Sequence, residues 1–231
     1  MTFLVMDTGG SLCVLALAEE STGAVRSVRV FEGRRTLSRR LMGEMDALLR
    51  TEGLALEDLS ALVVGIGPGS FTGVRVGVTT ARTLAQVAGK SLVGVGTLEA
   101  HAAVWGGADR ETLVVPVLPS RRNEVYAAFY QHGVCVEAAF AISPEALQTR
   151  LASLPDVVVC GEPLGLPGWR GASVSQPWTP PDGLARLAAR RLAMQDTDDP
   201  LGLLPLYVVP PNISTPKHPP FALPAPVSEG E

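Results

Sequence analysis

The sequence contains few of the residues that metal sites and disulfide frameworks require. Three cysteines and three histidines occur in 231 residues. The cysteines, Cys13, Cys135 and Cys160, are far apart and form no C-x-x-C pair, so we expect free thiols. The histidines lack the spacing of metal ligands, which disfavours a zinc or iron site.

A surplus of positive charge is also missing. Acidic residues outnumber basic residues by 23 to 19, and the formal net charge is −4. Because phosphate neutralisation needs a basic surface, this balance disfavours a protein that binds nucleic acid by itself. It leaves open a protein that touches RNA only through a partner.

Long apolar runs are absent as well, since none approaches the roughly 20 residues that a membrane helix needs. The first residues, M-T-F-L-V-M-D, have no basic stretch and an acid at position seven, which is unlike a signal peptide. Hydrophobic residues nevertheless make up 46% of the chain. We therefore expect a cytoplasmic protein that has a substantial core and no membrane contact.

The two halves of the chain show the same predicted order of strand, strand, strand, helix, strand and helix. In the first half we expect strands at 3–6, 13–18, 24–31, 61–64 and 92–95, and helices at 36–50, 74–88 and 97–105. In the second half we expect strands at 112–118, 124–131, 134–139 and 157–160, and helices opening at Ser143 and spanning 182–194. This order indicates an α/β protein with a duplicated unit. We predict subdomains at 1–108 and 109–213 and a flexible proline-rich tail at 214–231.

A glycine-rich segment, G-I-G-P-G-S-F-T-G-V-R-V-G at 65–77, joins a predicted buried strand to a predicted helix. Such turns often hold a phosphate at the helix N-terminus. The segment lacks the lysine of G-x-x-x-x-G-K-[ST], and Ser70 stands where G-x-G-x-x-G requires its third glycine. Two interpretations stay open: a structural or docking turn, stiffened by Pro68 and anchored by Phe71, or a loop with residual anion affinity.

The turn D-T-G-G-S at residues 7–11 allows three interpretations. An aspartic protease needs two such acids, and the chain has one D-T-G triplet, so that chemistry would require a homodimer. The turn also fits the first phosphate loop of the actin, Hsp70 and sugar kinase fold, or a simple hairpin turn with an Asx cap. The phosphate-loop interpretation supports an alternative function, a small nucleotide-binding phosphotransferase or ATPase. It would place the nucleotide at Asp7, Thr8, Gly9, Gly67 and Gly69.

Several motifs together resemble the TsaB (YeaZ) family. They are D-T followed by A-L at 7–17, an amphipathic helix, the glycine-rich segment at 65–77, and G-V-G-T-L-E-A at 94–100. A weaker similarity continues at 121–130, after Pro119-Ser120 in place of the family's Asp-Ala. The chain departs from the family at Leu37-Ser38, where a His-Thr or His-Ser is common, and at Gly9, where D-T-S is usual.

The resemblance implies the duplicated actin-like ATPase fold (ASKHA, ribonuclease H-like), with two subdomains of mixed sheets flanked by helices. It implies a subunit with no catalytic residues that pairs with the catalytic paralogue TsaD and, in bacteria, with the ATPase TsaE. The complex forms threonylcarbamoyladenosine beside the anticodon, and this subunit meets tRNA only through it. No cofactor and no metal are expected, although weak ATP or ADP binding stays open. The H-x-x-x-H metal pair of the catalytic paralogue does not occur in this sequence.

The helices at 36–50 and 74–88 are the predicted contact with the partner, because a stripe of small residues on the second lets another helix approach closely. The candidate interface residues are Leu37, Leu41, Met45, Val74, Gly77, Val78 and Ala81. The same helices could join two copies into a homodimer when the partner is missing. The other interpretation is that both stripes pack on the chain's own sheet.

Overall fold

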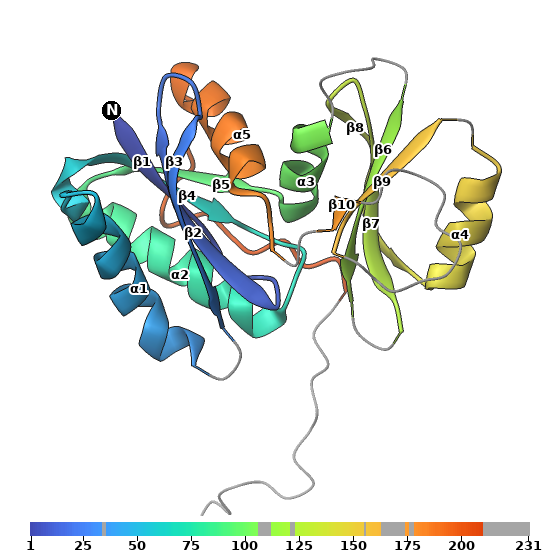
Figure 1. Ribbon diagram of the computed structural model, residues 1–231, viewed down its shortest axis with the longest axis horizontal. Helices are drawn as coiled ribbons and strands as arrows, with labels where there is room; N and C mark the ends of the chain where they lie inside the picture. The colour runs from blue at the N-terminus through green and yellow to red at the C-terminus, as the bar shows by residue number, and fades with distance from the viewer. Residues whose placement is uncertain are drawn as a thin grey trace, which may run out of the picture.

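The computed structural model describes residues 1–33, 36–105, 112–120, 123–154, 156–162, 174–175 and 178–209. Within them the chain forms two five-stranded mixed sheets with helices on their faces (Figure 1). The first sheet has the order β3-β2-β1-β4-β5, and the second has the order β10-β9-β6-β7-β8. Read from β8, the second sheet repeats the first strand for strand, with the same parallel and antiparallel pairs. The predicted duplication is confirmed.

Nearly every element was expected from the sequence. The first unit contains β1 (Thr2–Asp7), β2 (Leu12–Glu19), β3 (Val25–Glu32), α1 (Leu37–Thr51), the 3-10 turn η1 (Leu56–Asp58), β4 (Leu59–Gly65), α2 (Phe71–Ala88), β5 (Ser91–Val95) and α3 (Thr97–Trp105). The second contains β6 (Leu113–Pro119), β7 (Val125–Gln131), β8 (Val134–Ile142), α4 (Pro144–Ala152), β9 (Val157–Gly161), β10 (Val174–Ser175) and α5 (Pro181–Ala193). Strand β10 was not predicted. Helix α2 begins at Phe71 rather than at residue 74, because Ser70 caps it by accepting the Gly73 N–H.

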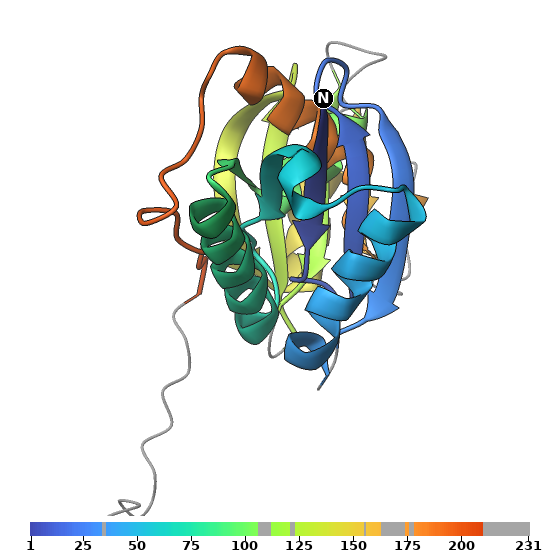
Figure 2. The same ribbon diagram turned by 90° about the vertical axis from the view of Figure 1, so that its left-hand side faces the viewer.

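The first sheet is covered on both faces because its central strands are apolar throughout. Side chains alternate along β1, so that Leu4 and Met6 join a core with α1 and α2. Phe3 and Val5 point the other way and join a core with α5. Helices α1 and α2 therefore lie on one face of the sheet and α5 on the other, as Figures 1 and 2 show.

Helix α5 follows the second sheet in sequence but packs on the first. Its buried residues Leu184, Ala185 and Ala188 belong to the core on that sheet. It passes α3 so closely that a Cβ on Gly183 would overlap the carbonyl group of Ala100. The predicted subdomain boundary after residue 108 stays a prediction. Helix α5, which comes after that boundary in the sequence, packs on the first unit. The predicted tail at 214–231 lies outside the described residues.

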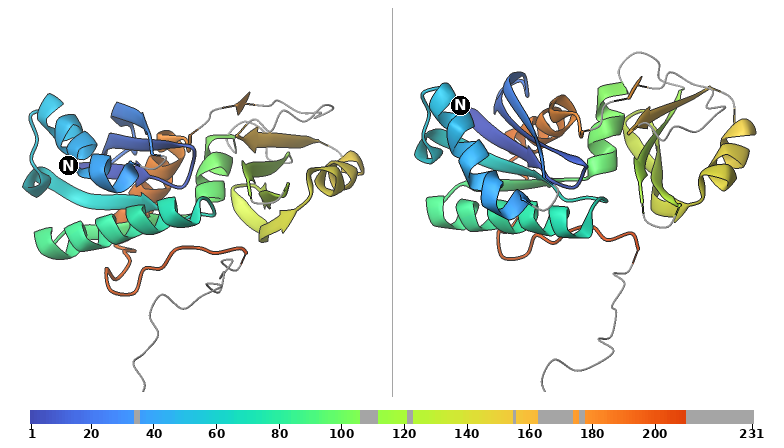
Figure 3. Two further views of the ribbon diagram at one scale, coloured as in Figure 1. Left: turned by 90° about the horizontal axis from the view of Figure 1, so that it is seen from below. Right: turned by 60° about the horizontal axis from the view of Figure 1, so that its bottom comes forward.

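Residues 196–209, here called the C-terminal strap, run along the first sheet beside α2 (Figures 2 and 3). The Asp198 N–H donates to the Leu92 carbonyl at 2.8 Å, and the Leu206 N–H donates to the Ile66 carbonyl at 2.8 Å. The Gly94 N–H also donates to the Asp198 carboxylate at 2.7 Å, so Asp198 gives partners to backbone groups on the outer edge of β5. None of the described helices is both long and apolar enough to cross a membrane.

Candidate functional site: the glycine-rich loop, the cleft and the outer face of α2

The first turn and the glycine-rich segment, far apart in sequence, pack directly on each other. The Ser70 N–H donates to the Gly9 carbonyl at 2.7 Å, and the Thr8 hydroxyl donates to the Gly73 carbonyl at 2.8 Å. A Cβ on Gly73 would overlap the Thr8 carbonyl oxygen, and a Cβ on Gly77 would overlap the Thr8 hydroxyl. Glycine is therefore required where α2 crosses the first turn, and these backbone groups bind each other.

Asp7 lies at the end of β1, buried beneath this contact. Its carboxylate accepts hydrogen bonds from the Gly9 N–H at 2.7 Å, from the Thr97 hydroxyl at 3.0 Å and from the Thr179 hydroxyl. Burial raises the pKa of Asp7, and the three hydrogen bonds oppose that rise. Thr97 begins α3 and Thr179 precedes α5, so one carboxylate ties the first turn to two helices. With its oxygens engaged in a closed space, Asp7 is poorly placed to hold the water shell of a magnesium ion.

We expect Asp7→Asn to fold and to gain stability relative to the wild type as the pH rises. The folded-state pKa of Asp7 is raised, so its contribution to stability is fully present below the unfolded-state pKa and is lost as the pH rises through the folded-state value. Asparagine keeps the shape and removes the charge, and the threonine hydroxyls can donate to it or accept from it. Urea unfolding between pH 4 and pH 7 measures this. The free energy of unfolding of Asp7→Asn, relative to that of the wild type, should increase as the pH rises. The opposite slope would contradict a buried carboxylate of raised pKa.

A cavity of about 350 Å³ lies between the two units, next to the first turn. Its described lining consists of Gly9, Gly10, Ser11, Pro68, Gly69, Ser70, Phe71, Thr97, Leu118, Pro119, Ser120, Tyr126, Glu162 and Thr179. No lysine or arginine stands among these residues. The Glu162 carboxylate instead faces the first turn, with Oε1 3.2 Å from the position that a Cβ on Gly10 would take. A carboxylate beside the turn disfavours a phosphate group there by charge repulsion.

The five residues predicted to hold a nucleotide are brought together, but with different exposure. Gly9 and Gly69 line the cavity, whereas Asp7 and Thr8 are buried behind them. Gly67 has a φ of 103° and donates its N–H to the Thr97 hydroxyl at 3.2 Å. Weak binding of ATP or ADP stays a prediction, and the described lining offers it no cation.

The seven predicted interface residues lie inside the chain. Leu37, Leu41 and Met45 on α1, and Val74, Gly77, Val78 and Ala81 on α2, are all buried. The six residues other than glycine are at most 8% exposed. These side chains therefore do not form an exposed surface, because the apolar stripe of each helix packs on its own sheet and Gly77 serves the contact with Thr8. That α1 and α2 meet a partner stays a prediction, and such a contact would use their outer faces.

The outward side of α2 exposes one charged residue, Arg75. Its other exposed residues, here called the outer stripe, are Thr72, Thr79, Thr83, Gln86 and Val87. Val87 is 79% exposed, and Met42 on the neighbouring α1 is 47% exposed. The charged residues Arg75 and Arg82 lie to one side of the stripe, where Arg75 stacks over the Phe71 ring and Arg82 binds the C-terminal strap.

The cysteines and histidines form no site within the described part of the chain. All three cysteines are free, as predicted, and burial raises the pKa of Cys13 and of Cys160 to about 12. Burial lowers the pKa of His101 to about 4, which keeps the imidazole neutral. Among the described residues no group of His, Cys, Asp and Glu is placed to hold a metal ion.

Thr179, Glu162 and the strap were missed at the level of sequence. Thr179 and Glu162 lie more than 150 positions after the first turn. Glu162 approaches it from the end of β9 in the second sheet, and Thr179 approaches it just before α5. The strap has no periodic apolar pattern, so no local signal marks it. Thr97 lies within the G-V-G-T-L-E-A motif. That motif was the sequence signal that could have indicated its hydrogen bond to Asp7.

The architecture and the site together define the fold class of this protein. Two units with one strand order, joined around a cleft, make the duplicated fold of actin-like ATPases. Inorganic polyphosphate/ATP-glucomannokinase from an Arthrobacter strain shares this fold, with a TM-score of 0.52 at 15% identity over 84% of this chain and 99% of that one. YeaZ from Pseudomonas aeruginosa superposes with a TM-score of 0.71 at 26% identity, over 89% of this chain and 99% of that one.

Sequence comparison then identifies the family. The chain is 35% identical to the tRNA threonylcarbamoyladenosine biosynthesis protein TsaB of Escherichia coli over 162 residues, or 67% of this chain and 68% of that protein. It is 37% identical to the Bacillus subtilis protein of the same name over 132 residues, which span 57% of this chain and only 56% of that relative. The family model for TsaD, tRNA N6-adenosine threonylcarbamoyltransferase, matches residues 32–144. The chain belongs to the TsaB (YeaZ) family.

Proposed function

We propose that this chain is a non-catalytic subunit in the formation of threonylcarbamoyladenosine in tRNA, and that it pairs with a TsaD-type catalytic paralogue. The names of its relatives support the process, and the match of the TsaD model to residues 32–144 supports a partner of related fold. The ATPase TsaE joins the pair in this proposal. The tRNA is contacted through the complex, in keeping with the net charge of −4.

The cleft supports a non-catalytic role. Its described lining has no lysine or arginine, and the buried Asp7 is fully hydrogen-bonded within the chain. Phosphoryl transfer needs positive charge around the phosphates, which Lys, Arg or magnesium usually supplies. The glycine-rich segment, which could have provided backbone N–H groups, is bound to the first turn instead.

The observation that carries the proposal is the uncharged outer stripe of α2. A helix of 18 residues that is exposed on one side normally carries several charged residues there, whereas this side has three threonines, Val87, Gln86 and a single charge, Arg75, beside them. The side chains of the outer stripe can be buried against a partner without leaving a charge unpaired, and Arg75 lies to one side of them over the Phe71 ring. The TsaD model match covers α1 and α2, so a paralogue would bring the same pair of helices to the contact. When the paralogue is absent, a second copy of this chain would pair through the same face.

Sedimentation velocity of the chain mixed with the TsaD-type protein of the same genome tests this. We expect a one-to-one complex whose formation does not require ATP. The chain sedimenting at its own mass at micromolar concentrations, with the partner folded, would contradict the proposal.

A further inference from the structure

The C-terminal strap exposes a row of large apolar side chains. Residues 200–209, P-L-G-L-L-P-L-Y-V-V, contain no charge. Their exposed members, between 37% and 68% accessible, are Leu201, Leu204, Leu206, Tyr207 and Val209. Large apolar groups gathered on a surface usually mark an interaction site, whereas single ones are common.

The strap is held in place, so its row is not a loosely placed chain end. The Arg82 guanidinium donates to the carbonyls of Pro200 and Leu201, the second at 2.7 Å. Leu203 points inward and packs with the core beneath α2. The Tyr207 ring lies 5.1 Å from the ring of Phe71, the first residue of α2. A surface that is already ordered loses little entropy when it binds.

The row is continuous with the outer stripe of α2. Figures 2 and 3 show the strap running along α2, on the side away from α1. Arg82 is the residue between them, and its charge is bound to strap carbonyls. A partner that lies on the outer stripe therefore comes next to the strap.

The area that a stable pair needs also points to the strap. At 1.5 Å per residue and about 10 Å between helix axes, α1 and α2 present a face of only about 500 Å². A standard interface buries roughly 800 Å² on each partner. A third parallel segment of similar length, such as the strap, adds about 250 Å² by the same estimate and brings the sum to that size.

We propose that the exposed row of the C-terminal strap extends the outer faces of α1 and α2 into one docking surface for the TsaD-type partner. This inference rests on the proposed function, because it assigns more surface to the same complex. The strap lies outside residues 32–144, which the TsaD model matches. The proposed contact therefore uses a segment of this chain that the match to TsaD does not include.

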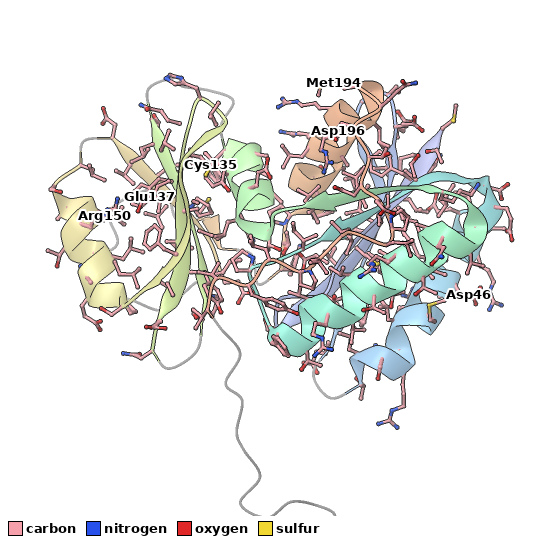
Figure 4. All side chains as sticks on the ribbon, turned by 180° about the vertical axis from the view of Figure 1, so that it is seen from behind. Asp46, Cys135, Glu137, Arg150, Met194 and Asp196 are labelled. Carbon is pink, nitrogen blue, oxygen red and sulfur yellow. The ribbon has the colours of Figure 1, made fainter. Side chains whose placement is uncertain are left out.

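Leu201→Glu and Leu204→Glu test the inference, with Val134→Glu as the matched control. Leu201 and Leu204 are 67% and 68% exposed. The substitutions change only their side chains, so the backbone hydrogen bonds that hold the strap remain. Val134 is 63% exposed on β8 of the second unit, next to Cys135, which Figure 4 shows far from α2. Titration calorimetry with the partner should show each strap variant binding about 10-fold more weakly and the double variant about 100-fold, with unchanged melting temperatures. The control should bind as the wild type does.

Three results would overturn the inference. Wild-type affinity of the double variant, with the complex intact, would show that the strap is not part of the docking surface while leaving the proposed function standing. A change confined to self-association would assign the row to a second copy of the chain. No binding by the wild type itself would remove the proposed function together with this extension of it.

Discussion

Gly73→Ala is expected to destabilise the protein by about 3 kcal/mol, a large effect for one methyl group. The added Cβ would overlap the carbonyl oxygen of Thr8, which is backbone and cannot rotate away. Relief requires α2 to move off the first turn, which would break the hydrogen bond from the Thr8 hydroxyl to the Gly73 carbonyl. Urea unfolding of the purified variant measures the loss.

Gly43→Ala is the matched control for this substitution. Gly43 lies in α1, and a Cβ there would meet no atom within 4 Å. The same chemical change should stabilise that helix by about 1 kcal/mol, because alanine is the better helix former. Equal effects of the two substitutions would contradict the close packing of α2 on the first turn. Gly77→Leu should also unfold the chain, so it cannot serve as a test of partner binding.

Sequence patterns predict the elements of the fold well because burial periodicity is local. The apolar run at 61–64 predicts β4, and the stripe through Leu41 and Met45 predicts α1. The two residues between the strands expected at 124–131 and 134–139, His132 and Gly133, both have positive φ, as a two-residue hairpin turn requires. Elements of this kind are decided by neighbours in the chain, which a sequence displays directly.

The site was harder to predict because its contacts are not local. A glycine-rich segment before a helix has the same appearance whether it holds a phosphate or another part of the backbone. Here the partner of Gly73 is Thr8, and only the crossing of α2 over β1 reveals it. The stripe of small residues on α2 was assigned to a partner because a sequence does not show which neighbour a helix face packs on, and in the structure it faces the sheet. The outer stripe on the opposite face, with its threonines, has no local sequence signal of function.

Thr83→Arg is expected to weaken binding of the TsaD-type partner by at least about 100-fold without affecting the fold. Thr83 lies in the middle of the outer stripe and is exposed, so arginine there meets solvent in the free chain. In the complex the guanidinium would be buried among uncharged side chains, and a buried charge without a partner is strongly unfavourable. Arginine also has the higher helix propensity, so the melting temperature should not fall.

Thr149→Arg provides the control for this substitution. Thr149 is an exposed threonine on α4, which covers the second sheet away from α1 and α2 (Figure 1). The two variants carry the same added charge, so a difference between them reports position alone. Calorimetric titration against the partner should find wild-type affinity for Thr149→Arg. Equal weakening by both would indicate a general charge effect and would contradict docking through α2.

The central claim is that the cleft and its glycine-rich loop hold the structure together while the outer face of α2 performs the function. The most direct test measures threonylcarbamoyl transfer to tRNA by the TsaD-type subunit, with TsaE present, after adding wild-type, Asp7→Asn or Thr83→Arg chain. The account predicts no transfer by this chain alone, full transfer with the wild type and with Asp7→Asn, and loss of transfer with Thr83→Arg. Turnover by the isolated chain that Asp7→Asn abolishes, or full transfer with Thr83→Arg, would contradict it.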